Sequence, residues 1–173
     1  MKHVILFEFI DEVEAYIKEF GRDSLLSKNL LIVALDAKVR AFLLNRGIHC
    51  ESTLGYFNYH SHCLIVEKTN QLLKEALSKA HFTDNLGLSE TYKHFFAYHV
   101  KFYLNYFCIN LEIIDQIYQQ HRFEQISCYS NKKIVSKAFI DPEERFLGNL
   151  IQRFCVRKAI DVCFLNVDPK KKK

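Results

Sequence analysis

The chain has 173 residues, 49% of them hydrophobic and 25% charged, which is ordinary for one folded domain and long enough to bury a substantial core. Its formal net charge is +4, but four of the 24 basic residues form the terminal run Lys170–Lys173, so the rest is close to neutral. A near-neutral body argues against a nucleic-acid partner, which requires a basic face. No window approaches the roughly 20 apolar residues of a spanning helix, so the sequence predicts no transmembrane segment.

The N-terminus does not resemble a signal peptide, because its apolar run is short and soon meets Glu8, Asp11 and Glu12. The six cysteines include no CxxC pair, and several lie in apolar contexts. This pattern favours reduced structural thiols over disulfides. We therefore expect a cytoplasmic protein with a single domain over residues 1–167 and a disordered basic tail over residues 168–173.

The stretch from Asn29 to Ile48 indicates the fold class. Leu30–Leu35 is a continuous apolar run, too short for a helix and typical of a parallel strand buried on both faces. Helical spacing begins after Asp36, which can cap that helix, and Gly47 supplies its C-terminal stop. This pattern is half of a Rossmann-like unit. In such sheets ligands bind beyond the carboxyl ends of the strands, where Asp36 lies.

The rest of the chain continues the alternation. The predicted elements are strands over residues 4–9, 30–35, 48–53, 124–130 and 161–167, and helices over residues 11–20, 36–45, 63–79, 89–121 and 141–157. A connection over residues 54–61 separates the third strand from the third helix. The alternation predicts an α/β fold: a three-layer Rossmann-like domain with a mainly parallel sheet of about five strands and one long helix.

Motifs specific for catalysis or cofactor binding are missing from the sequence. Neither GxGxxG nor GxxxxGK[ST] occurs, so we expect no dinucleotide bound in the usual Rossmann manner, and no cofactor. A small hydrolase or transferase would rely on Cys128, at the end of the fourth strand, or on Asp36. Nothing in the sequence supplies a base for the thiol, and no GxSxG elbow is present.

Four histidines are candidate metal ligands. His60 and His62 would share a face only in an extended segment, and no third ligand stands at a recognisable spacing. His94 and His99 are five residues apart, which is not the i, i+4 spacing of a helical zinc pair. We predict no metal site.

The long helix carries a broad aromatic stripe at helical spacing. Its members are Tyr92, Phe95, Phe96, His99, Phe102, Tyr103, Tyr106 and Phe107. The favoured interpretation is packing against the sheet. The alternatives are a surface for a lipid, an aromatic or sugar acceptor, or a partner helix. Interleaved Lys93 and Lys101 would also suit base stacking, but the near-neutral body argues against nucleic acid.

Four segments carry a resemblance to a known family: KHVILFEF, LLIVALDAKVRAFLLNRGIHCEST, the helix start SETYKHFF, and FEQISCYS. Over roughly Met1 to Val167, their order resembles the N-terminal Rossmann-like half of GT-B glycosyltransferase-like proteins of bacterial surface polysaccharide synthesis. The resemblance lies in the pattern and includes no diagnostic motif. It implies an acceptor-side domain, because in that superfamily the other half holds most of the nucleotide-sugar site. A partner would then be needed for donor binding.

The predicted ligand contacts lie near strand ends or at a helix start. They are Asp36, Ser89, Ser127, Tyr129 and Ser130. Asp36 could accept a hydroxyl proton or cap its helix, and the cap is favoured. The expected partners are a sugar or sugar-lipid acceptor and a second copy or partner chain, with no catalytic residue assigned. The alternative is a non-catalytic Rossmann-like binding or dimerisation module that uses the aromatic long helix.

Overall fold

The computed structural model describes residues 3–79, 89–129 and 147–165, and the chain divides into two compact units. The first, here called the sheet unit, comprises Met1–Tyr56 and Ile114–Lys173. The second, here called the helical unit, comprises Phe57–Ile113 and is inserted within the first in sequence. The single domain predicted from the sequence remains a prediction.

The sheet unit contains five parallel strands in the order β3-β2-β1-β4-β5. They are β1 (His3–Phe7), β2 (Leu30–Ala34), β3 (Glu51–Ser52), β4 (Gln125–Tyr129) and β5 (Asp161–Leu165). The predicted α/β fold with a parallel, Rossmann-like sheet is confirmed. The order of the strands reverses between β1 and β4, the point where open α/β sheets form their ligand crevice.

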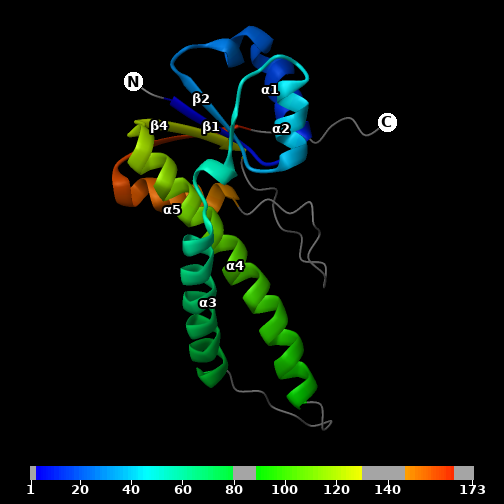
Figure 1. Ribbon diagram of the computed structural model, residues 1–173, viewed down its shortest axis with the longest axis vertical. Coiled ribbons are helices and arrows are strands. Elements are labelled where there is room, and N and C mark those ends of the chain that lie inside the picture. The colour runs from blue at the N-terminus through cyan, green and yellow to red at the C-terminus, as the bar shows by residue number, and fades with distance from the viewer. Residues whose placement is uncertain (1–2, 80–88, 130–146, 166–173) are drawn as a thin grey trace. The chain divides into compact units, whose positions relative to one another are not determined.

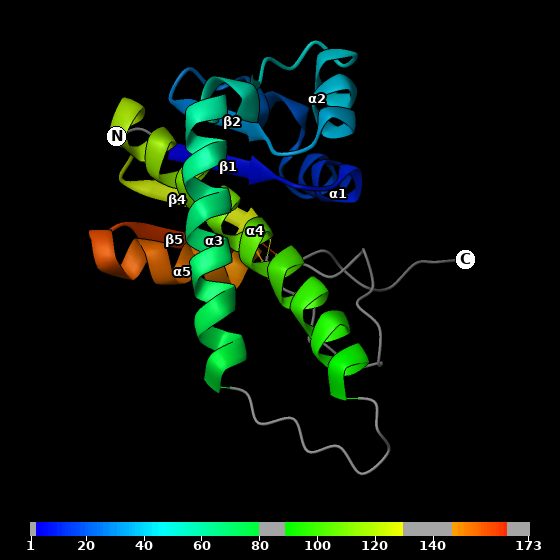
Figure 2. The same cartoon turned by 60° about the horizontal axis from the view of Figure 1, so that its bottom comes forward.

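Two helices cover one face of the sheet, α1 (Ile10–Phe20) and α2 (Ala37–Leu44). Because side chains alternate along a strand, Ile5 and Phe7 of β1 lie on this face. They form a buried core with residues of both helices: Val13, Tyr16, Val39 and Leu43. Figures 1 and 2 show these helices on one side of the strands.

The opposite face is covered by α5 (Leu147–Lys158), which contacts β4 and β5, and by the C-terminal turns of α4 (Ser89–His121). The ring of Tyr118 lies between two others, with centroids 6.2 Å from Phe154 and 5.4 Å from Phe123. Ile114, Ile117, Ile126 and Ile151 are buried in the same layer. The sheet unit is therefore a three-layer structure.

The ends of the elements follow local chemistry. The carboxylate of Asp36 accepts a hydrogen bond from the Lys38 backbone N–H at 2.7 Å, so the predicted cap of α2 is confirmed. Gly21 ends α1 at φ 80°, a backbone angle that favours glycine. Arg122 takes φ 47° and ends α4 directly after His121.

The prediction was least accurate around the third strand. Only Glu51 and Ser52 pair with β2, so β3 is much shorter than the extended segment predicted over residues 48–53. The predicted connection contains a short 3-10 helix (Thr53–Gly55) and the first turn of α3 (Tyr59–Lys79). Asn58 caps that turn, because its side-chain oxygen accepts from the Ser61 N–H at 2.9 Å. This asparagine was the sequence signal that the prediction overlooked.

The helical unit consists of α3 and the N-terminal part of α4, which lie side by side (Figures 1 and 2). The Thr69 hydroxyl of α3 is fully buried and donates a hydrogen bond of 2.8 Å to Asn105 Oδ1 of α4. At 33 residues, α4 runs from Ser89 to His121 as predicted and passes through both units. Within the described ranges, no helix combines the length and apolar character needed to cross a membrane.

Candidate functional site

The clearest polar cluster of the sheet unit joins the segment after β3 to the end of α4. Glu51 pairs with Val33 of β2, which in turn pairs with Leu6 of β1. Paired positions of parallel strands point to the same face, so Glu51 lies on the face covered by α4 and α5. Tyr56 follows the 3-10 helix, and its backbone N–H donates to Thr53 O at 2.9 Å. The last residue of α4, His121, completes the cluster.

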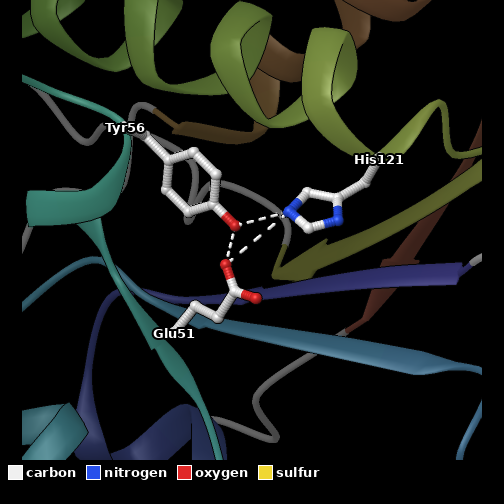
Figure 3. A network of polar contacts seen from close by, with 3 residues as sticks. All are labelled: Glu51, Tyr56 and His121. Carbon is white, nitrogen blue, oxygen red and sulfur yellow. Dashed lines mark hydrogen bonds and ion pairs between the residues drawn. The ribbon is translucent and has the colours of Figure 1, made fainter.

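Figure 3 shows the three side chains pointing toward one another. The Tyr56 hydroxyl contacts Glu51 Oε2 closely and lies 2.8 Å from His121 Nε2. The His121 and Glu51 atoms are 3.6 Å apart. Tyr56 is 4% exposed, while the side chains of His121 and Glu51 are 22% and 46% exposed. The cluster is thus buried on its tyrosine side and open to solvent on its glutamate side.

The hydrogen bonds of this cluster have a defined direction. The single phenolic proton of Tyr56 can be donated to Glu51, whose ionised carboxylate only accepts. His121 must then carry a proton on Nε2 and donate it to the tyrosine oxygen. The order of donation is His121 to Tyr56 to Glu51. Three groups able to exchange protons therefore meet at one point.

No pattern in the sequence indicates this cluster. Glu51 and Tyr56 are five residues apart, and His121 follows 65 residues later. No known motif has this spacing, and His121 was not among the histidines weighed as ligands. Only the packing of the α4 terminus beside the segment that follows β3 brings the three together.

The N-terminus of α1, which follows β1 at the strand-order reversal, has a different character. Glu12 of α1 is 3% exposed, and its Oε2 accepts backbone N–H bonds from Glu8 at 2.7 Å and Phe9 at 3.1 Å. In Rossmann folds that bind a dinucleotide, the first helix N-terminus is left to the pyrophosphate. Here a carboxylate of the protein itself occupies backbone donors at this position, beside the acidic Asp11. This gives a physical reason, besides the missing glycines, to expect no pyrophosphate there.

The predicted ligand contacts have different environments. Asp36 is exposed and caps α2. Ser127 and Tyr129 are only 2% and 3% exposed, and this burial argues against direct contact with a ligand. Ser89 begins α4, and Ser130 lies outside the described residues. The structure does not bring these five residues together in one described site, and their role in binding remains a prediction.

Ser127 has a partner at the distance expected of a nucleophile and its base. His3 Nε2 lies 2.7 Å from Ser127 Oγ, across neighbouring strands β1 and β4. Burial lowers the pKa of His3, so its imidazole stays neutral at pH 7. Because Ser127 is covered, the pair satisfies buried polar groups of the sheet rather than facing a substrate.

Cys128 does not have the properties of a nucleophile. It is fully buried, and burial first, then the nearby Glu12 carboxylate, raises the pKa of its thiol far above the usual range. Burial also raises the pKa of Cys155 in α5 to about 11. Both sulfurs stay protonated at neutral pH, whereas thiol nucleophiles react as thiolates. They act as small apolar residues of the core.

Two of the four candidate histidines have local partners. His62 packs against Phe57 with ring centroids 6.1 Å apart, and His99 bonds through Nδ1 to Phe95 O at 2.8 Å. Over residues 3–79, 89–129 and 147–165, no three His, Cys, Asp or Glu side chains gather closely enough to hold a metal ion.

The prediction that the aromatic stripe of α4 is buried is wrong for its first four turns. Five rings there, here called the aromatic face, have large exposed fractions. These are Tyr92 at 62%, Phe95 at 56%, Phe96 at 40%, Tyr98 at 72% and Phe102 at 59%. At about 100° per residue they span an arc of roughly 160° around the helix. Further along the helix, Tyr103, Tyr106 and Phe107 are partly buried.

Fold and site together define a class, an α/β protein with a parallel Rossmann-like sheet and an inserted pair of helices. No known protein family, curated protein or solved structure matches the chain. Its function therefore has to be inferred from the chemistry of its own residues.

Proposed function

We propose that this chain is a non-catalytic binding module that docks through the aromatic face of α4 onto a lipid bilayer with anionic headgroups. The observation that carries the proposal is the exposure of five rings on one helix, between 40% and 72% each. Contiguous apolar surface of this kind marks interaction sites in folded proteins.

Burying the exposed rings against a partner would stabilise the complex. Moving a phenylalanine side chain fully out of water contributes roughly 1.5–3 kcal/mol. Tyrosine and phenylalanine also suit the boundary between headgroups and acyl chains, because a ring can lie in apolar surroundings while a hydroxyl stays hydrated. Tyr92 and Tyr98 are the most exposed rings of the face.

The charges around the face favour an anionic partner. Residues 91–111 contain Lys93, His94, His99 and Lys101 but no Asp or Glu, and Glu90 and Glu112 flank this stretch. An anionic leaflet attracts such residues by about 1 kcal/mol for each lysine near its surface. The terminal run Lys170–Lys173, outside the described residues, adds charge of the same sign.

The same charges argue against a second copy as the occupant. In a symmetric pair the same patch meets itself. Lys93 and Lys101 would then place like charges on both sides of the interface. Paired helices normally place opposite charges beside the apolar seam.

Vesicle co-sedimentation tests the proposal. The full chain is mixed with phosphatidylcholine vesicles and with vesicles that also contain phosphatidylglycerol, and the same sample is sized by light scattering. We expect binding to the anionic vesicles that weakens as salt is raised. The double variant Phe95→Ser, Phe102→Ser should bind about tenfold or more weakly, because two rings at about 1 kcal/mol each exceed the 1.4 kcal/mol of a tenfold change.

Val156→Ser is the matched control, because Val156 is 78% exposed but lies on α5 of the sheet unit. It should bind as the unmodified chain does. Equal binding by the double variant would contradict the proposal. So would a stable dimer that the double variant dissolves, since the face would then belong to a second copy.

The acceptor-side glycosyltransferase-like role is a second proposal. It is supported by the parallel sheet with its order reversal and by the sequence resemblance, although a fold by itself does not establish function. A sugar-lipid acceptor would be compatible with docking on a bilayer. A thermal-shift screen against nucleotide sugars and free sugars tests it, because ligand at about 100 Kd stabilises the fold by about 2.7 kcal/mol. A panel without any shift would contradict it.

A further inference from the structure

We propose that two copies of this chain join their sheets through β5, with the two β5 strands antiparallel and centred on Cys163. The two edges of the sheet differ in length. At one edge, β3 has two residues and is followed directly by a 3-10 helix, which ends the strand. At the other, β5 pairs with β4 along all five of its residues (Figure 2). Within the described residues, no strand lies beyond β5.

The backbone groups of β5 alternate in direction. The Asp161 N–H donates to Glu124 O at 3.0 Å, so this residue bonds toward β4. Successive residues of a strand direct their N–H and C=O groups to opposite sides, so Cys163 also bonds toward β4. The N–H and C=O groups of Val162 and Phe164 therefore point away from β4. We call this outer side of the strand the β5 edge.

The β5 edge lacks the features that usually keep an edge strand from pairing, which are lysine, proline and bulges. The strand has the sequence DVCFL, and its register with β4 runs without a bulge from Asp161 to Leu165. The side chain of Phe164 is 37% exposed beside this edge. Another extended chain can therefore add to β5 through backbone hydrogen bonds.

A second copy fits the β5 edge because the strand is complementary to itself. A two-fold axis makes the two strands antiparallel, and the register centred on Cys163 pairs all five residues. This register sets Val162 opposite Phe164 of the second copy. Both residues point their backbone groups outward, so each such pair exchanges two hydrogen bonds. An aromatic residue opposite a β-branched residue is also a favourable cross-strand pair.

The charge of β5 is compatible with self-pairing. Its one charged residue, Asp161, begins the strand and would lie opposite Leu165 of the second copy. The two aspartates are then separated by the length of the strand, roughly 13 Å at about 3.3 Å per residue. Charges this far apart in solvent are largely screened at physiological salt. The β5 edge therefore brings no like charges together, in contrast to the aromatic face, and the proposal does not depend on that face.

Cys163 can report on the pairing directly. Because its backbone bonds toward β4, it would form a non-hydrogen-bonded pair with Cys163 of the second copy, with Cα atoms about 4.5 Å apart. A disulfide spans Cα separations of about 4.4–6.8 Å. Diamide, an oxidant that takes two electrons and two protons from a pair of thiols, should therefore link two copies through this residue.

Sedimentation and cross-linking of the full-length chain test the proposal. Under reducing conditions we expect a reversible monomer–dimer equilibrium by analytical ultracentrifugation. With diamide we expect a covalent dimer on non-reducing gels, in which peptide mass spectrometry finds Cys163 joined to Cys163. Phe164→Pro removes an outward N–H without taking one from the ladder with β4, so it should weaken dimerisation at least tenfold.

Phe164→Ala is the matched control, because it also removes the ring but keeps the N–H, and it should dimerise more tightly than Phe164→Pro. The double variant Phe95→Ser, Phe102→Ser should dimerise as the unmodified chain does, which separates this edge from the aromatic face. Far-ultraviolet circular dichroism checks that each variant is folded. Should Phe164→Pro not fold, the cross-link through Cys163 in the unmodified chain still decides the question.

A chain that stays monomeric as its concentration is raised would overturn the proposal and leave the β5 edge to a strand of another protein. Equal dimerisation of Phe164→Pro and Phe164→Ala would also overturn it, because the copies would then meet through another surface. So would diamide cross-links that form through other cysteines as readily as through Cys163.

Discussion

Phenylalanine side chains differ in burial between the two units. In the sheet unit Phe7 and Phe123 are 0% and 2% exposed, whereas Phe95 and Phe102 of the helical unit are 56% and 59% exposed. The sheet unit has helices on both faces of its strands, so rings such as Phe7 of the central strand β1 are covered, whereas Phe164 of the edge strand β5 is 37% exposed. In the helical unit, contact between two helices covers only part of each circumference. An aromatic residue becomes core only where a second layer exists to cover it.

We expect the largest difference in stability between the two units when one ring is truncated in each. Phe7→Ala leaves a cavity in a packed core, so we expect a loss of about 3–5 kcal/mol in the free energy of unfolding. Phe102→Ala removes a ring already in water and should cost no more than about 0.5 kcal/mol. Urea unfolding followed by circular dichroism measures both. Similar losses for the two variants would mean that the ring of Phe102 is buried in solution.

The second prediction concerns the carboxylate that caps α1 in the sheet unit. Glu12→Ala leaves the Glu8 and Phe9 backbone N–H groups without this acceptor, and we expect a loss of about 1–3 kcal/mol. Glu14→Ala, at an exposed position of the same helix, is the control and should change stability by less than about 0.5 kcal/mol. Equal stability of the two variants, measured by urea unfolding, would show that the cap contributes little.

In the helical unit, we expect one buried hydroxyl to contribute to the free energy of unfolding. Its contribution should be smaller than that of the Glu12 cap in the sheet unit. Thr69→Val keeps the shape of the side chain and removes the bond to Asn105, together with the longer contact to Val66 O of its own helix, so we expect a loss of about 1 kcal/mol. Ser78→Ala removes an exposed hydroxyl that bonds only to Glu75 O of its own helix. Thermal unfolding of both variants compares them. A melting temperature for Thr69→Val equal to that of Ser78→Ala would mean that the bond between the helices does not hold the unit together.

The smallest expected effect is a pH dependence from the sheet unit. Burial lowers the pKa of His3 in the folded chain below its usual 6.5. As the pH falls below 6.5, the unfolded chain takes up a proton that the folded chain resists, so the free energy of unfolding decreases. The stability that neutral His3 contributes is present above pH 6.5 and is lost toward lower pH.

His3→Gln keeps a hydrogen-bonding side chain near Ser127 but cannot titrate, so its stability should fall less between pH 7 and pH 5. Urea midpoints measured across this range test the difference. Parallel curves for the variant and the unmodified chain would assign the pH dependence to other groups.

Local patterns in the sequence were enough to predict the sheet. The apolar run Leu30–Leu35 and the junction at Asp36 predicted β2 and the cap of α2, because burial on both faces and a short capping side chain leave local signatures. The long helix from Ser89 to His121 was also predicted, since no Gly or Pro interrupts it. These features depend on neighbours within a few residues.

The features that only the tertiary structure determines depend on contacts between residues far apart in the chain. Helical spacing placed the rings of α4 on one face, but it could not show that Phe95 and Phe102 face water, because a buried and an exposed stripe have the same period. The cluster of Glu51, Tyr56 and His121 has no sequence signature, since its members meet only through the packing of α4 beside the segment after β3. By itself the sequence determined which segments are strands and helices, apart from the length of β3 and the first turn of α3. Packing determined which side chains are covered and which polar groups meet, because both depend on contacts between residues far apart in the chain.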